Sequence, residues 1–237
     1  YKSFVDLLGA FNDSPLLTPI GLNIRQASYA YAPDDKFVII SYEIENSGIS
    51  SLSNLYAGIF ADWDIINSNL NKSGYDEGRK MGYVNSLGND SLYAAIKVLS
   101  ATNAVNYSLD LDGSDAVNPN NAGYTSAEKY ISLSTNRDAS GGVNGADVGH
   151  VVSSGPFSLN TGEKVKVAFA IIAGDSLTDI QLSADSAQIR YDEDALSVKE
   201  NKIESEINKD IGIVSWININ VSLLFSLVSK RIKFWLT

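Results

Sequence analysis

N-L-Y-A-G-I-F-A-D-W-D-I-I-N, residues 54–67, is a nearly continuous apolar run that ends in two aspartates on either side of a tryptophan. Between Leu55 and Ala61 the run holds one glycine and no charge, and its Tyr and Phe are residues that favour strands. A continuous apolar segment of this composition is typical of a strand that is covered on both faces. We therefore predict a central β-strand here and expect the rest of the chain to be arranged around it.

The two aspartates at the end of this strand form the first candidate metal site. Asp62 and Asp64 share one side of the pleat, because alternate residues of a strand point to the same face. Like charges held in this way repel each other unless solvent, a cation or a basic partner lies between them. A polar segment with three asparagines follows over residues 67–71, and Asp76 comes soon after it. We expect a structural calcium ion at Asp62, Asp64 and Asp76; the alternative is a solvated acidic loop whose aspartates cap their own turn.

A second, weaker calcium candidate lies in the loop that starts at residue 110. Asp110, Asp112 and Asp115 place carboxylates at spacings similar to those of a calcium loop. The match is incomplete, because Gly113 comes too early and no Glu occupies the closing position.

Short segments with strand patterns, bounded by turn residues, recur along the chain. In residues 36–46, K-F-V-I-I-S-Y-E-I-E-N, apolar and polar side chains alternate, and Pro33 with two aspartates supplies a turn after residues 21–31. These two segments predict a hairpin. Further strands are expected over residues 80–86, 91–100, 104–110, 151–159 and 164–173.

Two helices are expected beside these strands. Thr125 with Glu128 forms a capping box for a helix over residues 125–133, and Ser176 caps a second helix whose apolar stripe extends to Tyr191. The pattern as a whole predicts a mainly β fold: an antiparallel, jelly-roll-like β-sandwich with one or two short helices docked on it.

The composition divides the chain into four parts. Residues 1–20 contain two prolines and predict an incoming linker, residues 21–196 form the sandwich domain, and residues 197–210 are a charged linker. Residues 211–237 are an apolar tail, which we expect the linker to decouple from the domain. The tail has the length and basic flank of a membrane span over residues 211–229, but its mid-segment asparagines and its alternation over residues 217–223 favour a strand.

The charge balance excludes one class of partner. The chain has a net charge of −10, and residues 1–210 carry 28 acidic against 15 basic groups. Such a body lacks the basic surface that neutralises nucleic-acid phosphates. With no cysteine, disulfides and thiolate metal sites are excluded, whereas calcium remains available. The sequence starts at Tyr1 without Met or a signal peptide, and we interpret it as a fragment of a longer chain.

The residues that catalysis would require are scarce. His150 is the only histidine, and it lies at a strand start with no nucleophile elbow elsewhere in the chain, so we expect a structural role for it. Trp63, Tyr56, Tyr83 and Tyr93 allow a sugar-stacking platform, but aromatics at strand spacing more often belong to a core. No catalytic residue is assigned.

Eight stretches carry a family resemblance through their order. They are E-I-E-N-S-G (43–48), N-L-Y-A-G-I-F-A-D-W-D-I (54–65), M-G-Y-V (81–84), L-Y-A-A-I-K-V-L (92–99), A-E-K-Y (127–130), H-V-V-S-S-G-P-F-S-L-N-T-G-E (150–163), V-A-F-A-I-I-A-G-D (167–175) and A-D-S-A-Q (184–188). Over about residues 22–194 the chain resembles an accessory region of large secreted proteins of the Bacteroidetes and Ignavibacteria type, found downstream of subtilisin-like serine protease domains.

The resemblance implies a secreted or cell-surface β-sandwich module without catalysis of its own. Its partners would be the other domains of the parent chain, which would be exported by a C-terminal sorting signal. A carbohydrate- or surface-binding module with a polysaccharide or cell-surface ligand is the alternative function. One departure is that no proline follows Pro156, whereas the sorting domain of such proteins begins with an Asn-Tyr-Pro-Asn-Pro-Phe-like sequence. Either the parent differs or the reading frame was lost near Lys209, which gives a third interpretation of the tail, after a membrane span and a strand.

Overall fold

A computed structural model of the chain describes residues 3, 5–31, 36–88, 91–100, 103–111, 117, 124–197 and 229–236. Its elements are β1 (Val5–Asn12), β2 (Leu22–Ala30), β3 (Phe37–Asn46), β4 (Leu52–Trp63), η1 (Ser68–Leu70), β5 (Asn71–Asp76), η2 (Glu77–Arg79), β6 (Met81–Ser86), β7 (Tyr93–Val98), β8 (Ala104–Asp110), α1 (Ser126–Ser134), β9 (Val148–Leu159), β10 (Lys164–Gly174), α2 (Leu177–Ser197) and β11 (Ser229–Leu236).

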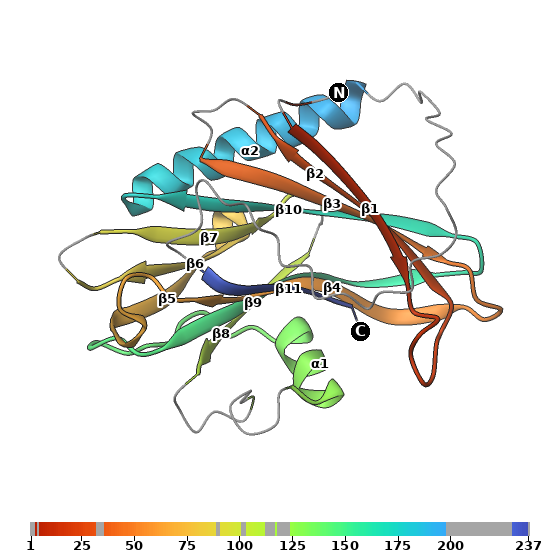
Figure 1. Ribbon diagram of the computed structural model, residues 1–237, viewed down its shortest axis with the longest axis horizontal. Coiled ribbons are helices and arrows are strands. Elements are labelled where there is room, and N and C mark those ends of the chain that lie inside the picture. Colours follow the sequence, from red (N-terminus) through yellow and green to blue (C-terminus); the bar gives the residue numbers. More distant parts are fainter. Residues whose placement is uncertain are drawn as a thin grey trace.

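The strands form two sheets that lie face to face (Figure 1). The seven-stranded sheet has the order β1-β2-β3-β10-β7-β6-β5, and the four-stranded sheet has the order β11-β4-β9-β8. All neighbouring strands pair antiparallel. This arrangement confirms the predicted mainly β sandwich, including the hairpin of β2 with β3 and the interior positions of β4 and β10.

Alternation along the interior strands fills the main core between the sheets. Ile59, Ala61 and Trp63 of β4 belong to this core together with Phe169 and Ile171 of β10. Because successive side chains of a strand point to opposite faces, the intervening residues of β10 face the other way. There they form a second apolar cluster with α2. The prediction that β10 is buried on both faces is thus confirmed.

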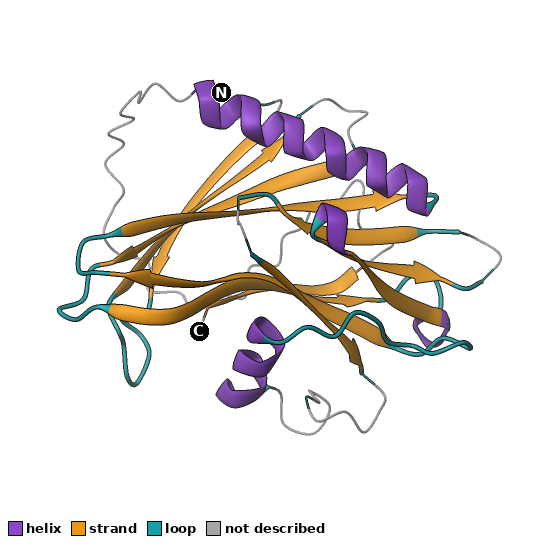
Figure 2. Cartoon of the chain, turned by 180° about the vertical axis from the view of Figure 1, so that it is seen from behind, coloured by secondary structure: helices purple, strands orange, loops and turns teal. Residues whose placement is uncertain are grey.

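One helix covers the outer face of each sheet (Figure 2). Ile180, Ala184 and Ala187 of α2 are fully buried against the seven-stranded sheet. On the opposite side of the sandwich, Leu133 of α1 packs with Phe60 on the four-stranded sheet. Both expected N-terminal caps are present: Thr125 and Glu128 form a capping box, and the Asp179 N–H donates to Ser176 Oγ at 3.2 Å. Caps of this kind satisfy backbone N–H groups that lack partners within the helix.

Two segments predicted outside the domain belong to its sheets. Residues 5–12, within the expected incoming linker, form the edge strand β1, whose backbone pairs with β2 along its whole length. Residues 229–236 of the expected apolar tail form β11, which pairs with β4, and Leu236 packs against the main core. This pairing corrects the expected decoupling of the tail. The alternation over residues 217–223, from which a strand was expected, is not part of β11. Residues 211–228 lie outside the described residues.

Candidate functional site

Three carboxylates meet at the end of β4, on the outer face of the four-stranded sheet. Asp62 and Asp64 lie there as expected, and they are joined by Asp147, which directly precedes β9. One oxygen from each carboxylate lies within 4.8 Å of the others, and all three residues are half-buried. Asp147 was not singled out from the sequence.

A loop between α1 and β9 brings Asp147 to this place. Arg137 forms a bridge to Tyr107 of β8, whereas Ser140 and Ala146 form bridges to Ser73 and Asn71 of β5. The loop thus ties together the edge strands of both sheets. The Asp147 carbonyl also accepts a hydrogen bond from the Leu111 N–H at 2.7 Å, which fixes the backbone next to the carboxylate.

The buried side chain of Asn71 holds the segment that follows Asp64. Its Oδ1 accepts from the Ile65 N–H at 2.9 Å, and its Nδ2 donates to the carbonyls of Ile65 at 2.9 Å and Asn67 at 3.0 Å. Ile66 has φ 60°, a left-handed conformation that is unusual for a β-branched residue. The segment therefore has a defined turn held by a single side chain.

The spacing of the carboxylates fits a divalent cation. Oxygens that bind one calcium ion at about 2.3–2.6 Å lie at most about 5 Å apart, and the observed separations fall within this limit. All three donors are hard oxygens, which suit calcium better than zinc. The register of β11 also places Arg231 opposite Asp62 in the ladder.

Asp76 belongs to a different site. Residues 71–76, expected as a polar loop, form strand β5, which carries Asp76 to the side of α2. There Asp76 Oδ2 accepts from Gln181 Nε2 at 2.9 Å and from Arg79 Nη1 at 3.1 Å. Arg79 also makes a bidentate pair with Asp185 of α2 at 3.0 Å for each bond. Burial raises the pKa of Asp76, but these hydrogen bonds outweigh it and leave the pKa below its usual value.

The second calcium candidate is only partly described. Asp110 is the last residue of β8 and is not a member of the described carboxylate group. Asp112 and Asp115 lie outside the described residues.

His150 is buried between the sheets. Its Nε2 accepts a hydrogen bond from Trp63 Nε1 at 2.9 Å, and both side chains have no exposed surface. Burial lowers the pKa of His150 to about 3, so the imidazole is neutral at pH 7. The structural role expected for this histidine agrees with these contacts.

The aromatic residues considered for sugar stacking do not form one platform. Trp63 lies in the core, whereas Tyr56 packs edge-on against Tyr130 of α1 at a centroid distance of 5.8 Å. Tyr83 and Tyr93 pack against each other in the cluster beneath α2. These side chains therefore lie in three separate places, each in or against an apolar cluster, as expected for core aromatics and not for a platform.

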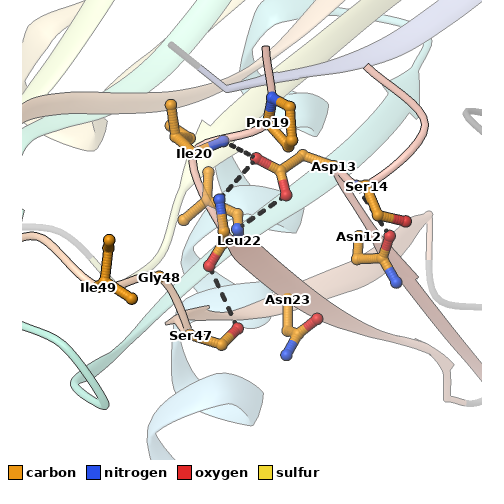
Figure 3. A pocket seen from close by; sticks show the side chains of 11 residues that line it. Asn12, Asp13, Ser14, Pro19, Ile20, Leu22, Asn23, Ser47, Gly48 and Ile49 are labelled. Atoms are coloured by element: carbon orange, nitrogen blue, oxygen red, sulfur yellow. Dashed lines mark hydrogen bonds between the residues drawn. The ribbon is translucent and has the colours of Figure 1, made fainter. Parts of the chain in front are cut away.

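A pocket of about 430 Å³ lies at the turn between β1 and β2 (Figure 3). Asp13 is its only ionisable lining residue. Its carboxylate accepts from the backbone N–H groups of Ile20, Gly21 and Leu22 at 2.6, 3.0 and 3.0 Å (Figure 3). Since these bonds hold the turn, we assign Asp13 a structural role and no catalytic one.

Comparisons with known proteins give little guidance. No family model and no curated protein matches the chain. Among solved structures, a protein of Escherichia coli K12 described as an aldose 1-epimerase is 8% identical, and the match covers 72% of this chain and 66% of that one. The TM-score is 0.36, a degree of similarity from which we draw no conclusion about fold or chemistry. Within the described part of the chain, no helix has the length and apolar character needed to cross a membrane.

Proposed function

We propose that this chain is a non-catalytic accessory module of a larger secreted or cell-surface protein, with a subtilisin-like protease as the parent. The order of the resembling stretches over residues 22–194 supports the context. The proposal that the module is non-catalytic rests mainly on the position of His150. Its acceptor nitrogen is occupied by Trp63 and it has no exposed surface, so it has no access to a substrate as a general base.

Its role in the parent would be that of a spacer or binding domain. The seven-stranded sheet, the four-stranded sheet and the two outer helices pack together through three apolar clusters. Its natural partners are then the neighbouring domains of the parent chain. A polysaccharide ligand receives no support from the aromatic residues, because Trp63 is fully buried.

Two measurements test this proposal. The purified chain should not hydrolyse casein, aryl esters or aryl glycosides above the rate of a heat-denatured sample, with or without calcium. Extending the reading frame upstream of Tyr1 should reveal a serine protease domain. Substrate turnover that disappears when one carboxylate is replaced would refute the non-catalytic role. An upstream reading frame without a protease domain would refute the proposed parent protein.

We further propose that Asp62, Asp64 and Asp147 bind a structural calcium ion. Their oxygens lie within the distance that a shared ion requires. An ion that binds the folded state alone stabilises it by about 2.7 kcal/mol at a hundredfold excess over Kd. For a chain of this size, that corresponds to a rise in melting temperature of about 5–11 °C.

The test is thermal melting in millimolar calcium and in chelator, with three variants. Asp64→Asn and Asp147→Asn should lose the calcium-dependent rise. Asp76→Asn is the matched control: it should lower the melting temperature, because Asp76 holds Arg79 and Gln181, but keep the full response to calcium. Equal melting temperatures of the unsubstituted chain in both conditions would refute the calcium site.

A further inference from the structure

The buried side chains of Trp63, His150 and Asn106 form a polar cluster on the inner face of the four-stranded sheet. They come from β4, β9 and β8, three adjacent strands, and none of them has exposed surface. Gly82 of β6 covers the cluster from the opposite sheet. A Cβ atom at residue 82 would lie 2.2 Å from Asn106 Oδ1 and 2.9 Å from His150 Nδ1, so the two sheets are in close contact at this point.

The hydrogen bond from Trp63 defines the protonation state of the imidazole. An indole nitrogen can only donate, so His150 Nε2 must present its lone pair to Trp63 Nε1, and the single proton of the neutral ring lies on Nδ1. Nδ1 is directed to the side of Gly82 and Asn106 Oδ1. Asn106 is fixed in turn, since its Nδ2 donates to the Arg137 carbonyl at 3.1 Å.

We propose that this cluster is an acid-sensitive lock in the core of the sandwich, centred on the bond between β4 and β9 beneath Gly82, which holds while His150 is neutral and opens when it gains a proton. A proton taken from solvent would add to Nε2, the atom that accepts from Trp63. Both ring nitrogens would then be donors, so the indole N–H would face an N–H, and the bond between them would be lost. The cation would also be buried without a counter-charge, which folded proteins avoid.

Among the described residues, no charged group acts as such a counter-charge for His150. Around the imidazole, β4 contributes Trp63, β8 contributes Asn106 and Ser108, and β6 contributes Gly82. The nearest carboxylates along these strands are Asp62 and Asp64, on either side of Trp63, Asp147, three residues before His150, and Asp110, two residues beyond Ser108. None of them contributes to the lowered pKa of His150, for which burial is the cause.

The direction of the pH effect follows from the two states. The pKa of His150 is about 3 in the folded chain, against an ordinary value of 6.5. Between these values the unfolded chain binds the additional proton, so stability is complete above pH 6.5 and falls as the pH decreases. Well below pH 6.5 the folding equilibrium constant should fall about tenfold for each pH unit, which gives a decrease of about 25-fold between pH 7 and 5.

The experiment is urea denaturation of the full chain at pH 7, 6.5 and 5 in the presence of chelator. His150→Gln keeps an acceptor for Trp63 but cannot titrate, and its folding constant should change less than threefold over the same range. Trp63→Phe is the matched control: it removes the bond and lowers stability at every pH, but keeps the dependence of about 25-fold, because burial is the cause of the lowered pKa. If the folding equilibrium constants of the unsubstituted chain and of His150→Gln depended equally on pH, the proposal would be overturned.

Nuclear magnetic resonance gives an answer even if His150→Gln fails to fold. Because the chain has one histidine, its ring ¹⁵N signals need no assignment. At pH 7 they should show the neutral Nδ1–H form, unchanged down to pH 5 in the folded molecules. A folded-state titration near pH 6.5, or the Nε2–H form, would overturn the lock.

Discussion

Replacing Asn71 by Ala should be among the most destabilising single changes in the chain. The amide makes three hydrogen bonds to the backbone of the segment after Asp64, at 2.9, 2.9 and 3.0 Å. Asn71 and Ile65 are both fully buried, so water has no access to the groups that would be left behind. The variant removes every one of these bonds and leaves the Ile65 N–H and carbonyl without partners.

The expected loss follows from the number of groups affected. Each hydrogen bond contributes a net stabilisation of about 1 kcal/mol, and a buried polar group left without a partner costs about 1–3 kcal/mol. Since relaxation of the segment recovers part of this, we expect a decrease of about 3–4 kcal/mol in the free energy of unfolding. For a chain of this length, each kcal/mol lowers the melting temperature by about 2–4 °C, which gives a decrease of about 6–16 °C.

Urea denaturation followed by far-ultraviolet circular dichroism measures this loss. Asn69→Ala, a change to an exposed amide two residues away, serves as the control and should alter stability by less than about 0.5 kcal/mol. The Asn71→Ala variant should also respond less to calcium, because the turn next to Asp64 is no longer held. A loss below about 1 kcal/mol would refute the reasoning and show that pairing of β5 with residue 146 is sufficient.

Two further changes test the contact between the sheets and the role of the tail. Gly82→Ala should lower the free energy of unfolding by about 1–3 kcal/mol, since its Cβ would overlap Asn106 Oδ1. The control Gly9→Ala places its Cβ where no atom lies within 4 Å, so it should change the free energy of unfolding little. Equal losses for the two variants in urea denaturation would contradict this packing. Deleting residues 229–237 should lower the melting temperature by many degrees, because β4 loses one of its two partner strands and Leu236 leaves the core. An unchanged melting temperature in scanning calorimetry would show that the tail is decoupled from the domain, as expected from the sequence.

The elements with strong local patterns were predictable. The apolar run of β4 and the V-A-F-A-I-I-A segment of β10 required burial on both faces, and the cap residues Thr125 and Ser176 marked the helix starts. In each case the signal lies within about a dozen neighbouring residues. The β2–β3 hairpin likewise has its turn chemistry between its own strands.

The remaining features depend on partners that are distant in the sequence. N-K-S-G-Y-D of β5 has no apolar alternation, and its strand conformation comes from pairing with β6 and with the loop at Ser140 and Ala146. The same strand moved Asp76 away from the expected site. Asp147 reaches Asp62 only through the register of β9 with β4, which local periodicity does not specify.

The pairing of β11 with β4 has a consequence for synthesis of the chain. Ala61 leaves the ribosome long before its partner Ile232, so the four-stranded sheet stays incomplete until residues 229–236 have been synthesised. Until then, one edge of an apolar strand exposes backbone groups that can pair with other chains. Late closure by residues far apart in sequence is slow, and it exposes the intermediate to aggregation. A nascent chain stalled before residue 229 should therefore depend on chaperones more than a chain that includes β11.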